Sequence, residues 1–186
     1  CDTEDASPCG EADLTFADAT TSSINIDYTS DVALYGFQLD VSGVTLTGVS
    51  SDVFDVVSGA SGTVLGFSWT GESLPAGSGT LVSLSFDESA FDQTISVSNV
   101  VISGAGGTSV VVTGPADAGI PLCDDNDGDT VCNDADPWPD CSDDGTDPYD
   151  TCGDCNGGDA AQDCNGDCYG DADPDSCGVC SGGNSG

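Results

Sequence analysis

Apolar and polar residues alternate over short stretches through most of residues 10–122. A period of two is typical of β-strands that bury one face, and the runs of Gly, Ser, Asp and Pro between the stretches indicate turns. No segment of this region has a helical apolar period of useful length. The alternating apolar residues that predict strands are Leu14 and Phe16; Ile24, Ile26 and Tyr28; Phe37, Leu39 and Val41; Val44 and Leu46; Leu65, Phe67 and Trp69; Val82, Leu84 and Phe86; Ile95 and Val97; Val100 and Ile102; Val110 and Val112.

The pattern predicts an all-β fold, an antiparallel β-sandwich with 8–9 strands over residues 12–114. A domain of this size buries roughly two-thirds of its unfolded surface, which is enough for a core without metal ions. The aromatic residues of this region, including Trp69, are therefore expected in the core. Residues 1–11 form a short lead, and residues 115–122 form a linker.

Two segments resemble the cohesin-like jelly-roll domain. The first, INIDYTSDVALYGFQLDV at residues 24–41, joins a Tyr-centred strand end to a Gly-Phe strand. The second, PAGSGTLVSLSF at residues 75–86, contains a Gly-x-Leu-x-x-Leu-x-Phe strand. The resemblance covers roughly residues 12–114. It implies a jelly roll and, because cohesins bind dockerins through one sheet face, a module that recognises a dockerin-like protein.

Residues 123–186 have a different composition, with eighteen Asp, nine Cys, no Glu and almost no large apolar residue. Such a segment cannot form a conventional core, so other interactions must hold it together. The first Asp run matches a calcium loop at positions 1, 3, 5 and 12, where carboxylates surround one hard cation with six to eight oxygens. The ligands predicted for this loop are Asp125, Asp127, Asp129, Asp136 and the backbone carbonyl of Val131.

This loop departs from the usual pattern at two positions. Thr130 stands at position 6, where Gly normally makes a sharp turn, and Asp136 is shorter than the usual Glu at position 12. The alternating Asp-x-Asp-x-Asp beside a cysteine resembles a thrombospondin type-3 repeat, in which the chain wraps calcium ions without a protein core. The resemblance implies several Ca²⁺ ions as cofactors. A second calcium site is predicted from Asp140, Asp143, Asp144, Asp147 and Asp150.

Cysteine usage predicts disulfides and an oxidising, extracellular compartment. The pattern Cys-Gly-x-Cys-x-Gly-Gly-Asp/Asn at 152–159 and 177–184 resembles repeats of large secreted bacterial surface proteins. The two Cys-x-x-Cys pairs could also form a zinc ribbon, but the cysteines between them favour disulfides. The candidate disulfide cysteines are Cys1, Cys9, Cys123, Cys132, Cys141, Cys152, Cys155, Cys164, Cys168, Cys177 and Cys180.

Because eleven cysteines is an odd number, at least one has no intrachain partner. In one arrangement Cys9 and Cys123 staple the ends of the sandwich, eight tail cysteines pair among themselves, and Cys1 is left for another chain or a lipid. In the other, Cys1 pairs with Cys9 and the odd cysteine lies in the tail. The sequence leaves both open.

The charge of the chain excludes several functions. With 34 acidic residues, no Lys, no Arg and no His, the formal charge is −34, which excludes binding to nucleic acids and to anionic membranes. The same absences exclude Ser-His-Asp and Cys-His nucleophiles, so the chain is not expected to be an enzyme. No apolar run is long enough to span a membrane. The absence of an initiator Met and of a leader predicts a processed mature chain or an excised segment.

These features predict an extracellular, calcium-stabilised structural or adhesive module at the cell surface. Copies of the chain are expected to assemble into a surface layer, filament or matrix, so the first partner is the same chain. The alternative is a cohesin-like binding module that recognises a dockerin-like protein or a glycan. Glycosidase chemistry by two carboxylates is a third hypothesis, but no pair stands out among the acidic residues.

Overall fold

The computed structural model describes residues 10–59 and 61–182, so the predictions for Cys1 and Cys9 lie outside the described residues. The chain divides into two compact units, one that ends at Cys123 and one that begins at Asp124. We call the first the sandwich unit and the second the acidic unit. Each is described separately below.

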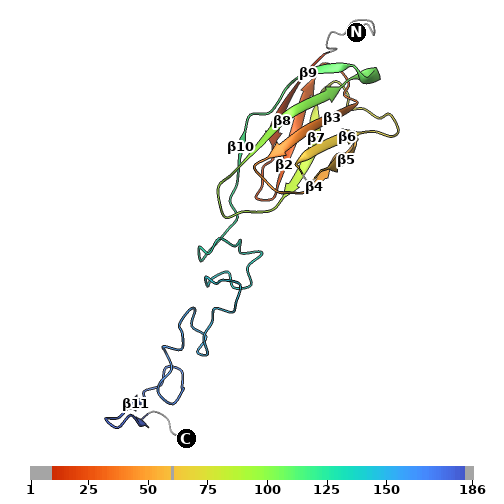
Figure 1. Ribbon diagram of the computed structural model, residues 1–186. Helices are drawn as coiled ribbons and strands as arrows, with labels where there is room; N and C mark the ends of the chain where they lie inside the picture. Colours follow the sequence, from red (N-terminus) through yellow and green to blue (C-terminus); the bar gives the residue numbers. More distant parts are fainter. Residues whose placement is uncertain (1–9, 60, 183–186) are drawn as a thin grey trace. The chain divides into compact units, whose positions relative to one another are not determined.

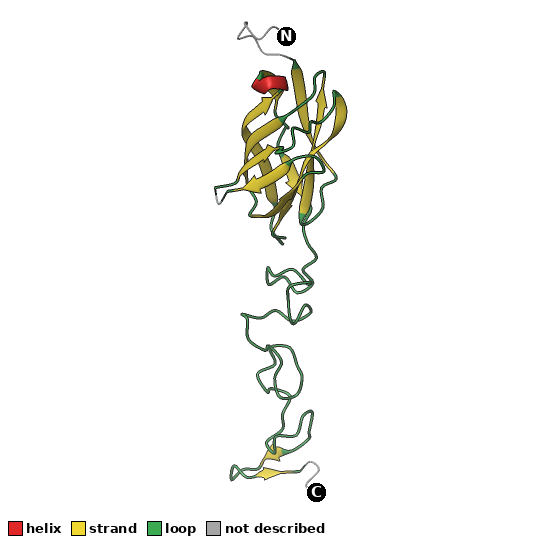
Figure 2. Ribbon diagram, turned by 90° about the vertical axis from the view of Figure 1, so that its right-hand side faces the viewer, coloured by secondary structure: helices red, strands yellow, loops and turns green. Residues whose placement is uncertain are grey.

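The sandwich unit confirms the all-β prediction (Figures 1 and 2). One layer has the strand order β4-β7-β2-β1, and the other has β9-β8-β3-β6-β5 with β10 also paired to β8. All of these pairs are antiparallel, but a parallel pair of β1 with β9 joins the two layers. The elements are β1 (Glu11–Ala17), β2 (Ser23–Ser30), β3 (Gly36–Ser42), β4 (Leu46–Ser50), β5 (Asp55–Ser58), β6 (Thr63–Phe67), β7 (Gly77–Phe86), β8 (Gln93–Ser103), the 3₁₀ turn η1 (Ala105–Gly107), β9 (Ser109–Thr113) and β10 (Ala118–Ile120).

The core lies between the two layers and uses the alternation that the sequence shows. On β2, Ile24, Ile26 and Tyr28 point inward, and on β3 Phe37 and Leu39 do the same. Since side chains of a strand alternate between its two faces, the polar residues between them face solvent. The strands at the two ends of the sheet order, β4 and β5, are short, which limits edge-to-edge pairing with another chain.

The prediction that Leu65, Phe67 and Trp69 face the core was wrong. Val64 is fully buried instead, whereas Leu65 is 40% exposed and Trp69 is 83% exposed. The reason lies in Gly66, which also faces inward: a Cβ there would lie 2.1 Å from Cε1 of the Phe37 ring. The ring of Phe37 occupies that space, so the strand presents its small residues to the core.

Two other boundaries differ from the sequence prediction. The stretches Ile95/Val97 and Val100/Ile102 belong to one strand, β8, which carries an irregularity where Asn99 has φ +50°. Such a bulge shifts the inward side by one residue, which makes one strand resemble two. The linker expected over residues 115–122 is partly incorporated in the sandwich unit, because β10 pairs with β8 and buries Ile120.

The acidic unit contains turns and disulfides in place of a layered core. Its only strands within the described residues are β11 (Asp173–Pro174) and β12 (Cys180–Ser181), which pair with each other. Three disulfides join Cys141 to Cys155, Cys152 to Cys168, and Cys164 to Cys180.

Disulfide formation in the acidic unit agrees with the preference for disulfides over zinc. Cys123 and Cys132 are disulfide-bonded as well, and the free thiol within the described residues is the exposed Cys177. The arrangement in which all eight tail cysteines pair is therefore wrong. The odd cysteine lies in the tail, as the second arrangement expects.

Candidate cation site in the acidic unit

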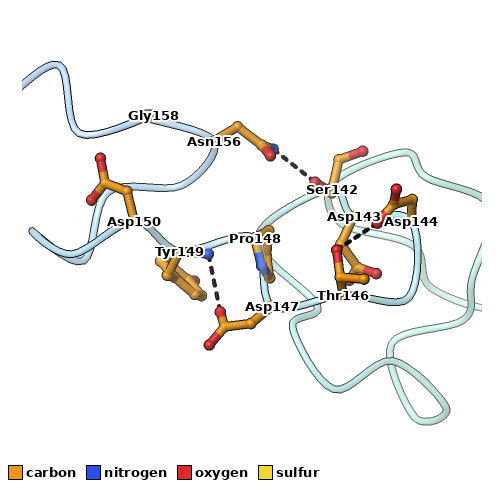
Figure 3. Close-up of a pocket in the computed structure, with 10 residues that line it drawn as sticks. All are labelled: Ser142, Asp143, Asp144, Thr146, Asp147, Pro148, Tyr149, Asp150, Asn156 and Gly158. Atoms are coloured by element: carbon orange, nitrogen blue, oxygen red, sulfur yellow. Dashed lines mark hydrogen bonds between the residues drawn. The ribbon is translucent and has the colours of Figure 1, made fainter.

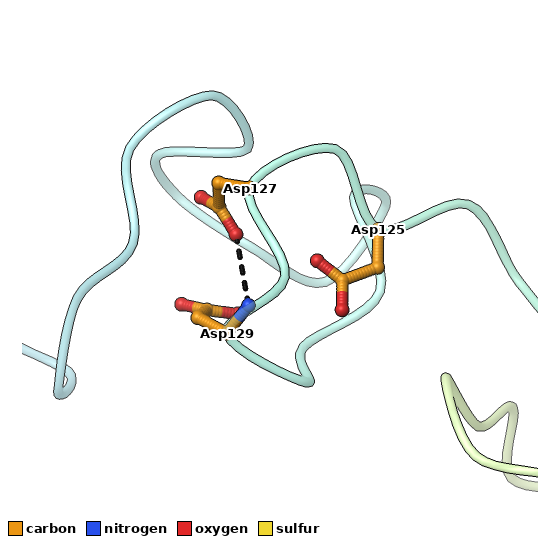
Figure 4. A group of neighbouring side chains, drawn as sticks. All are labelled: Asp125, Asp127 and Asp129. Carbon is orange, nitrogen blue, oxygen red and sulfur yellow. Dashed lines mark hydrogen bonds between the residues drawn. The ribbon is translucent and has the colours of Figure 1, made fainter.

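The first Asp run brings three predicted ligands together. Carboxylate oxygens of Asp125, Asp127 and Asp129 lie within 4.8 Å of one another, and Figure 4 shows the three side chains on one turn of the chain. The alternating spacing places them on one side, since all three are half-buried while the residues between them are exposed. Asp125 Oδ1 and Oδ2 accept backbone N–H bonds from Gly128 (2.8 Å) and Thr130 (3.0 Å), which closes the loop.

A second group of three carboxylates shares Asp129 with the first. Oxygens of Asp129, Asp136 and Asp143 also lie within 4.8 Å of one another. The backbone N–H of Asp143 donates to Asp129 Oδ2 (3.2 Å), so this contact holds the two segments together. Asp143 was predicted in the second calcium site, and the structure places it with the first loop instead.

Three carboxylates of these groups have an oxygen without a donor. Asp127, Asp136 and Asp143 each accept one backbone bond at Oδ1, from Asp129 (3.2 Å), Trp138 (2.8 Å) and Gly145 respectively. Oδ2 of all three is buried and has no hydrogen-bond partner among the described residues. Asp136 is the most buried acidic side chain described, with 9% of its surface exposed. Leaving such oxygens unpaired is costly, because each has lost water without gaining a donor or a counter-charge.

The negative charges of this cluster also lack a counter-charge. Burial raises the pKa of Asp127, a backbone hydrogen bond from Asp129 opposes the rise, and the negative charges of Asp129, Asp136 and Asp125 add to it. The chain offers no Lys, Arg or His anywhere to neutralise the cluster. Bound cations would supply the missing partners of the buried oxygens.

Thr130 shows how the chain makes the turn without the usual glycine. Its φ is +82°, close to the +78° of Gly128 in the same loop. A β-branched residue is strongly disfavoured in this region, because its Cβ crowds the backbone. The loop therefore has the sharp turn that a calcium loop needs at position 6, but holds it under strain.

The second predicted calcium site is not assembled in the same way. Asp143, Asp144, Asp147 and Asp150 line one open cavity of about 690 Å³ (Figure 3). Within the described residues, however, no three carboxylates of this set converge. Asp144 accepts from Thr146, Asp147 from the N–H of Tyr149, and Asp140 from the side chain of Asn126.

Asp150 has a structural role that spacing alone did not indicate. Its Oδ1 accepts the N–H groups of Cys152 and Asp154, both at 2.9 Å, and its Oδ2 accepts that of Asp159 at 2.9 Å. The hydrogen bond from Asp154 is the main reason that its pKa is lowered; burial opposes this effect, and the other backbone bonds add to it. With three backbone donors, the Asp150 carboxylate caps this turn.

The same capped turn occurs twice more. Asp163 Oδ1 accepts from Asn165 and Asp167, and its Oδ2 accepts from Ala172. Asp175 Oδ1 accepts from Cys177 and Val179. In each turn a glycine with positive φ follows three residues after the Asp, at Gly153, Gly166 and Gly178. The signal in the sequence is therefore Asp-x-x-Gly rather than Cys-Gly-x-Cys, and it repeats every 12 or 13 residues.

The sandwich unit carries a second candidate surface. A groove of about 290 Å³ opens on the outer face of β3, β6 and β8. Its rim includes large apolar side chains that solvent reaches, with Val101 58%, Leu65 40% and Tyr35 38% exposed. Trp69 stands beside it, with its ring edge-on to that of Phe67 at a centroid distance of 5.0 Å.

No family model and no curated protein matches the chain. The chain is similar in structure to a non-cellulosomal cohesin from the archaeon Archaeoglobus fulgidus, with a TM-score of 0.45 and 16% identity over 62% of this chain and 91% of that one. It is also similar to a cohesin module of a family 33 glycoside hydrolase from Clostridium perfringens, with a TM-score of 0.42 and 13% identity over 62% of this chain and 98% of that one.

A third similarity is to a chain of a type I cohesin–dockerin complex from Clostridium thermocellum, with a TM-score of 0.42 and 13% identity over 64% of this chain and 97% of that one. At identities this low, the function of the chain has to be argued from its own residues. Among the described residues, no helix combines the length and the apolarity that crossing a membrane requires.

Proposed function

We propose that the chain is a non-enzymatic extracellular module in which calcium ions fold part of a spacer that is attached to a β-sandwich. The observation that carries this proposal is the cluster around Asp129, where Oδ2 of Asp136 is buried without a partner beside two other carboxylates. A cation bound there would turn a destabilising group of charges into a stabilising contact.

Calcium fits this cluster better than other ions. The ligands are all carboxylates, which hard cations prefer, and a zinc or copper site would use His or Cys. Calcium binds oxygen at about 2.3–2.6 Å, so an ion can touch oxygens that are up to roughly 5 Å apart. The carboxylate oxygens here lie within 4.8 Å of one another.

The medium outside a cell can supply the ion. Extracellular calcium sites have dissociation constants of about 10⁻⁴ to 10⁻³ M. At a free calcium concentration about 100-fold above the dissociation constant, one site stabilises the bound form by about 2.7 kcal/mol. That is a large share of the stability of a small unit without a core. The disulfides of the acidic unit support the same oxidising location.

The role that follows is structural or adhesive. Disulfides and cations make the acidic unit a spacer that resists collapse, and the sandwich unit is the part that other molecules can contact. With a formal charge of −34, copies of the chain repel one another until cations screen or bridge them. Calcium is therefore also the condition for the copies to assemble at a surface, in a filament or in a matrix.

Hydrogen exchange of the full chain, read by mass spectrometry, tests the proposal. Calcium is expected to slow exchange in residues 124–145, and a chelator is expected to reverse this. Exchange in the strands of the sandwich unit and in the turns at Asp150, Asp163 and Asp175 is expected to stay the same, which makes them internal controls. Equal exchange of residues 124–145 with calcium and with chelator would contradict the proposal.

The groove on the sandwich unit favours a second function, the binding of a protein partner. Its exposed apolar rim at Leu65 and Val101 is typical of a contact surface. A dockerin-like protein with basic residues around an apolar centre would complement the groove and the acidic chain. A display screen should yield such a partner, with binding lost in Leu65→Asp and kept in Phe91→Asp, an exposed position before β8 that does not line the groove. Glycan-array hits that Trp69→Ala removes would assign the face to a sugar instead.

A further inference from the structure

The sharing of Asp129 between the two carboxylate groups suggests more than one ion. We infer that the acidic unit binds a pair of calcium ions bridged by the Asp129 carboxylate, one held with Asp125 and Asp127 and the other with Asp136 and Asp143. The inference rests on the proposed function and specifies its metal site.

The two groups occupy different parts of the chain. Asp125 and Asp127 belong to the same turn as Asp129, whereas Asp143 lies fourteen residues beyond it and reaches Asp129 through a backbone hydrogen bond of 3.2 Å. Neither group includes the other's outer pair of ligands. One ion therefore closes the turn, and the other joins the turn to the segment that follows Cys141.

The residues with a buried oxygen that lacks a donor are divided between the two groups. Asp127 belongs to the first group, and Asp136 and Asp143 belong to the second. A single ion in the first group would leave the second group, including the 9% exposed Asp136, without a counter-charge. An ion in the second group alone would leave Asp127 in the same state.

Asp129 retains enough acceptor capacity to serve both ions. Its Oδ1 accepts the N–H of Val131 at 2.9 Å, and its Oδ2 accepts that of Asp143 at 3.2 Å. A carboxylate has about four lone-pair directions, so each oxygen keeps one for a metal. A bridging carboxylate also places negative charge between two cations, which reduces their mutual repulsion.

Calcium-binding stoichiometry on the full chain tests the inference. Equilibrium dialysis against calcium at physiological salt would compare the wild type with Asp125→Asn, Asp143→Asn and Asp129→Asn. Asp144→Asn is the matched control, because it removes one charge from the same unit but its carboxylate, bonded to Thr146, belongs to neither group. Wild type and control are expected to bind the pair, Asp125→Asn and Asp143→Asn one ion fewer each, and Asp129→Asn two fewer.

The outcomes separate the inference from the proposed function. No calcium bound by the wild type at about 10 mM, roughly 10- to 100-fold above the expected dissociation constant, would end the proposed function itself. One bound ion that both Asp125→Asn and Asp143→Asn remove would keep the function and overturn the pair. So would an Asp129→Asn variant that loses a single ion. If a variant misfolds, energy transfer from Tb³⁺ to Eu³⁺ in the wild type loaded with both detects two neighbouring ions, and its absence would refute the pair.

Discussion

Replacing the strained residue of the first loop should tighten calcium binding. Thr130 has a φ of +82°, where a non-glycine residue costs about 1–3 kcal/mol. In Thr130→Gly this strain disappears, but the glycine adds about 0.5–1 kcal/mol of conformational entropy to the unbound loop. The net gain is about 1 kcal/mol, which corresponds to a roughly fivefold lower dissociation constant. The unbound loop is free to relax, so the relief is expected to appear in the affinity.

Tryptophan fluorescence during a calcium titration provides the measurement. The backbone N–H of Trp138 donates to Asp136 Oδ1 at 2.8 Å, so this tryptophan lies two residues from a proposed ligand and is bonded to it through its main chain. Trp69→Phe removes the signal of the sandwich unit. Gly128→Ala is a control in which calcium affinity is expected to fall. Its φ is +78° and a Cβ there meets nothing within 4 Å, so a weaker affinity in that variant reports backbone conformation alone. An unchanged or weaker affinity of Thr130→Gly, together with the expected loss in Gly128→Ala, would refute the argument.

The remaining predictions concern stability, pH and the disulfides. Gly66→Ala places a Cβ 2.1 Å from the Phe37 ring and should cost about 1–3 kcal/mol, seen as a lower Tm of the sandwich unit, whereas Gly119→Ala, with nothing within 4 Å, should leave Tm unchanged. Burial is the largest single influence on the pKa of Asp163 and raises it, but the backbone hydrogen bonds together outweigh burial and lower the pKa. At Asp150 the backbone hydrogen bond from Asp154 is the largest influence, and the pKa is lowered as well. Their stabilisation is complete above the unfolded pKa of about 3.9 and is lost as pH falls through the lower folded pKa. The protection factors of amides in the capped turns, which are corrected for the intrinsic pH dependence of exchange, should therefore fall in acid, and a turn that stays equally protected below that pKa would contradict this. Chelation should speed the reduction of the Cys141–Cys155 disulfide, because Cys141 is 0% exposed beside the cation cluster, while Cys164–Cys180 reacts at the same rate; alkylation and mass spectrometry would show both.

The sequence predicted the sandwich because strands with one buried face leave a strict alternation, as Ile24, Ile26 and Tyr28 do. It failed at β6, where apolar residues occupy both faces. Only the size of the Phe37 ring beside Gly66 decides which side turns inward, and that contact joins distant parts of the chain. Register irregularities such as the one at Asn99 are invisible to a fixed period for the same reason.

For the cation site, local spacing was sufficient for Asp125, Asp127 and Asp129, which one turn brings together. It assigned Asp143 to another site, because the contact with Asp129 depends on how residues 137–142 fold back. Spacing also could not separate a carboxylate that is free to bind a metal from one that caps a turn. Asp150 was predicted as a ligand from the spacing of the Asp residues, and the structure shows its carboxylate accepting three backbone N–H groups of a turn.

The acidic unit uses the same residue type in two opposite ways, and hydrogen-bond saturation distinguishes them. From Asp150 onward, the turn-capping carboxylates have backbone donors and the turns are joined by disulfides. The carboxylates clustered around Asp129 instead keep buried oxygens without donors, at Asp127, Asp136 and Asp143. The capped turns therefore contain the donors that their carboxylates need, and the cluster around Asp129 lacks them. Because the chain has no basic side chain, the proposed function requires cations from the surroundings at the cluster around Asp129. The structure of this cluster is therefore expected to depend on the calcium concentration, whereas the capped turns are expected to keep theirs.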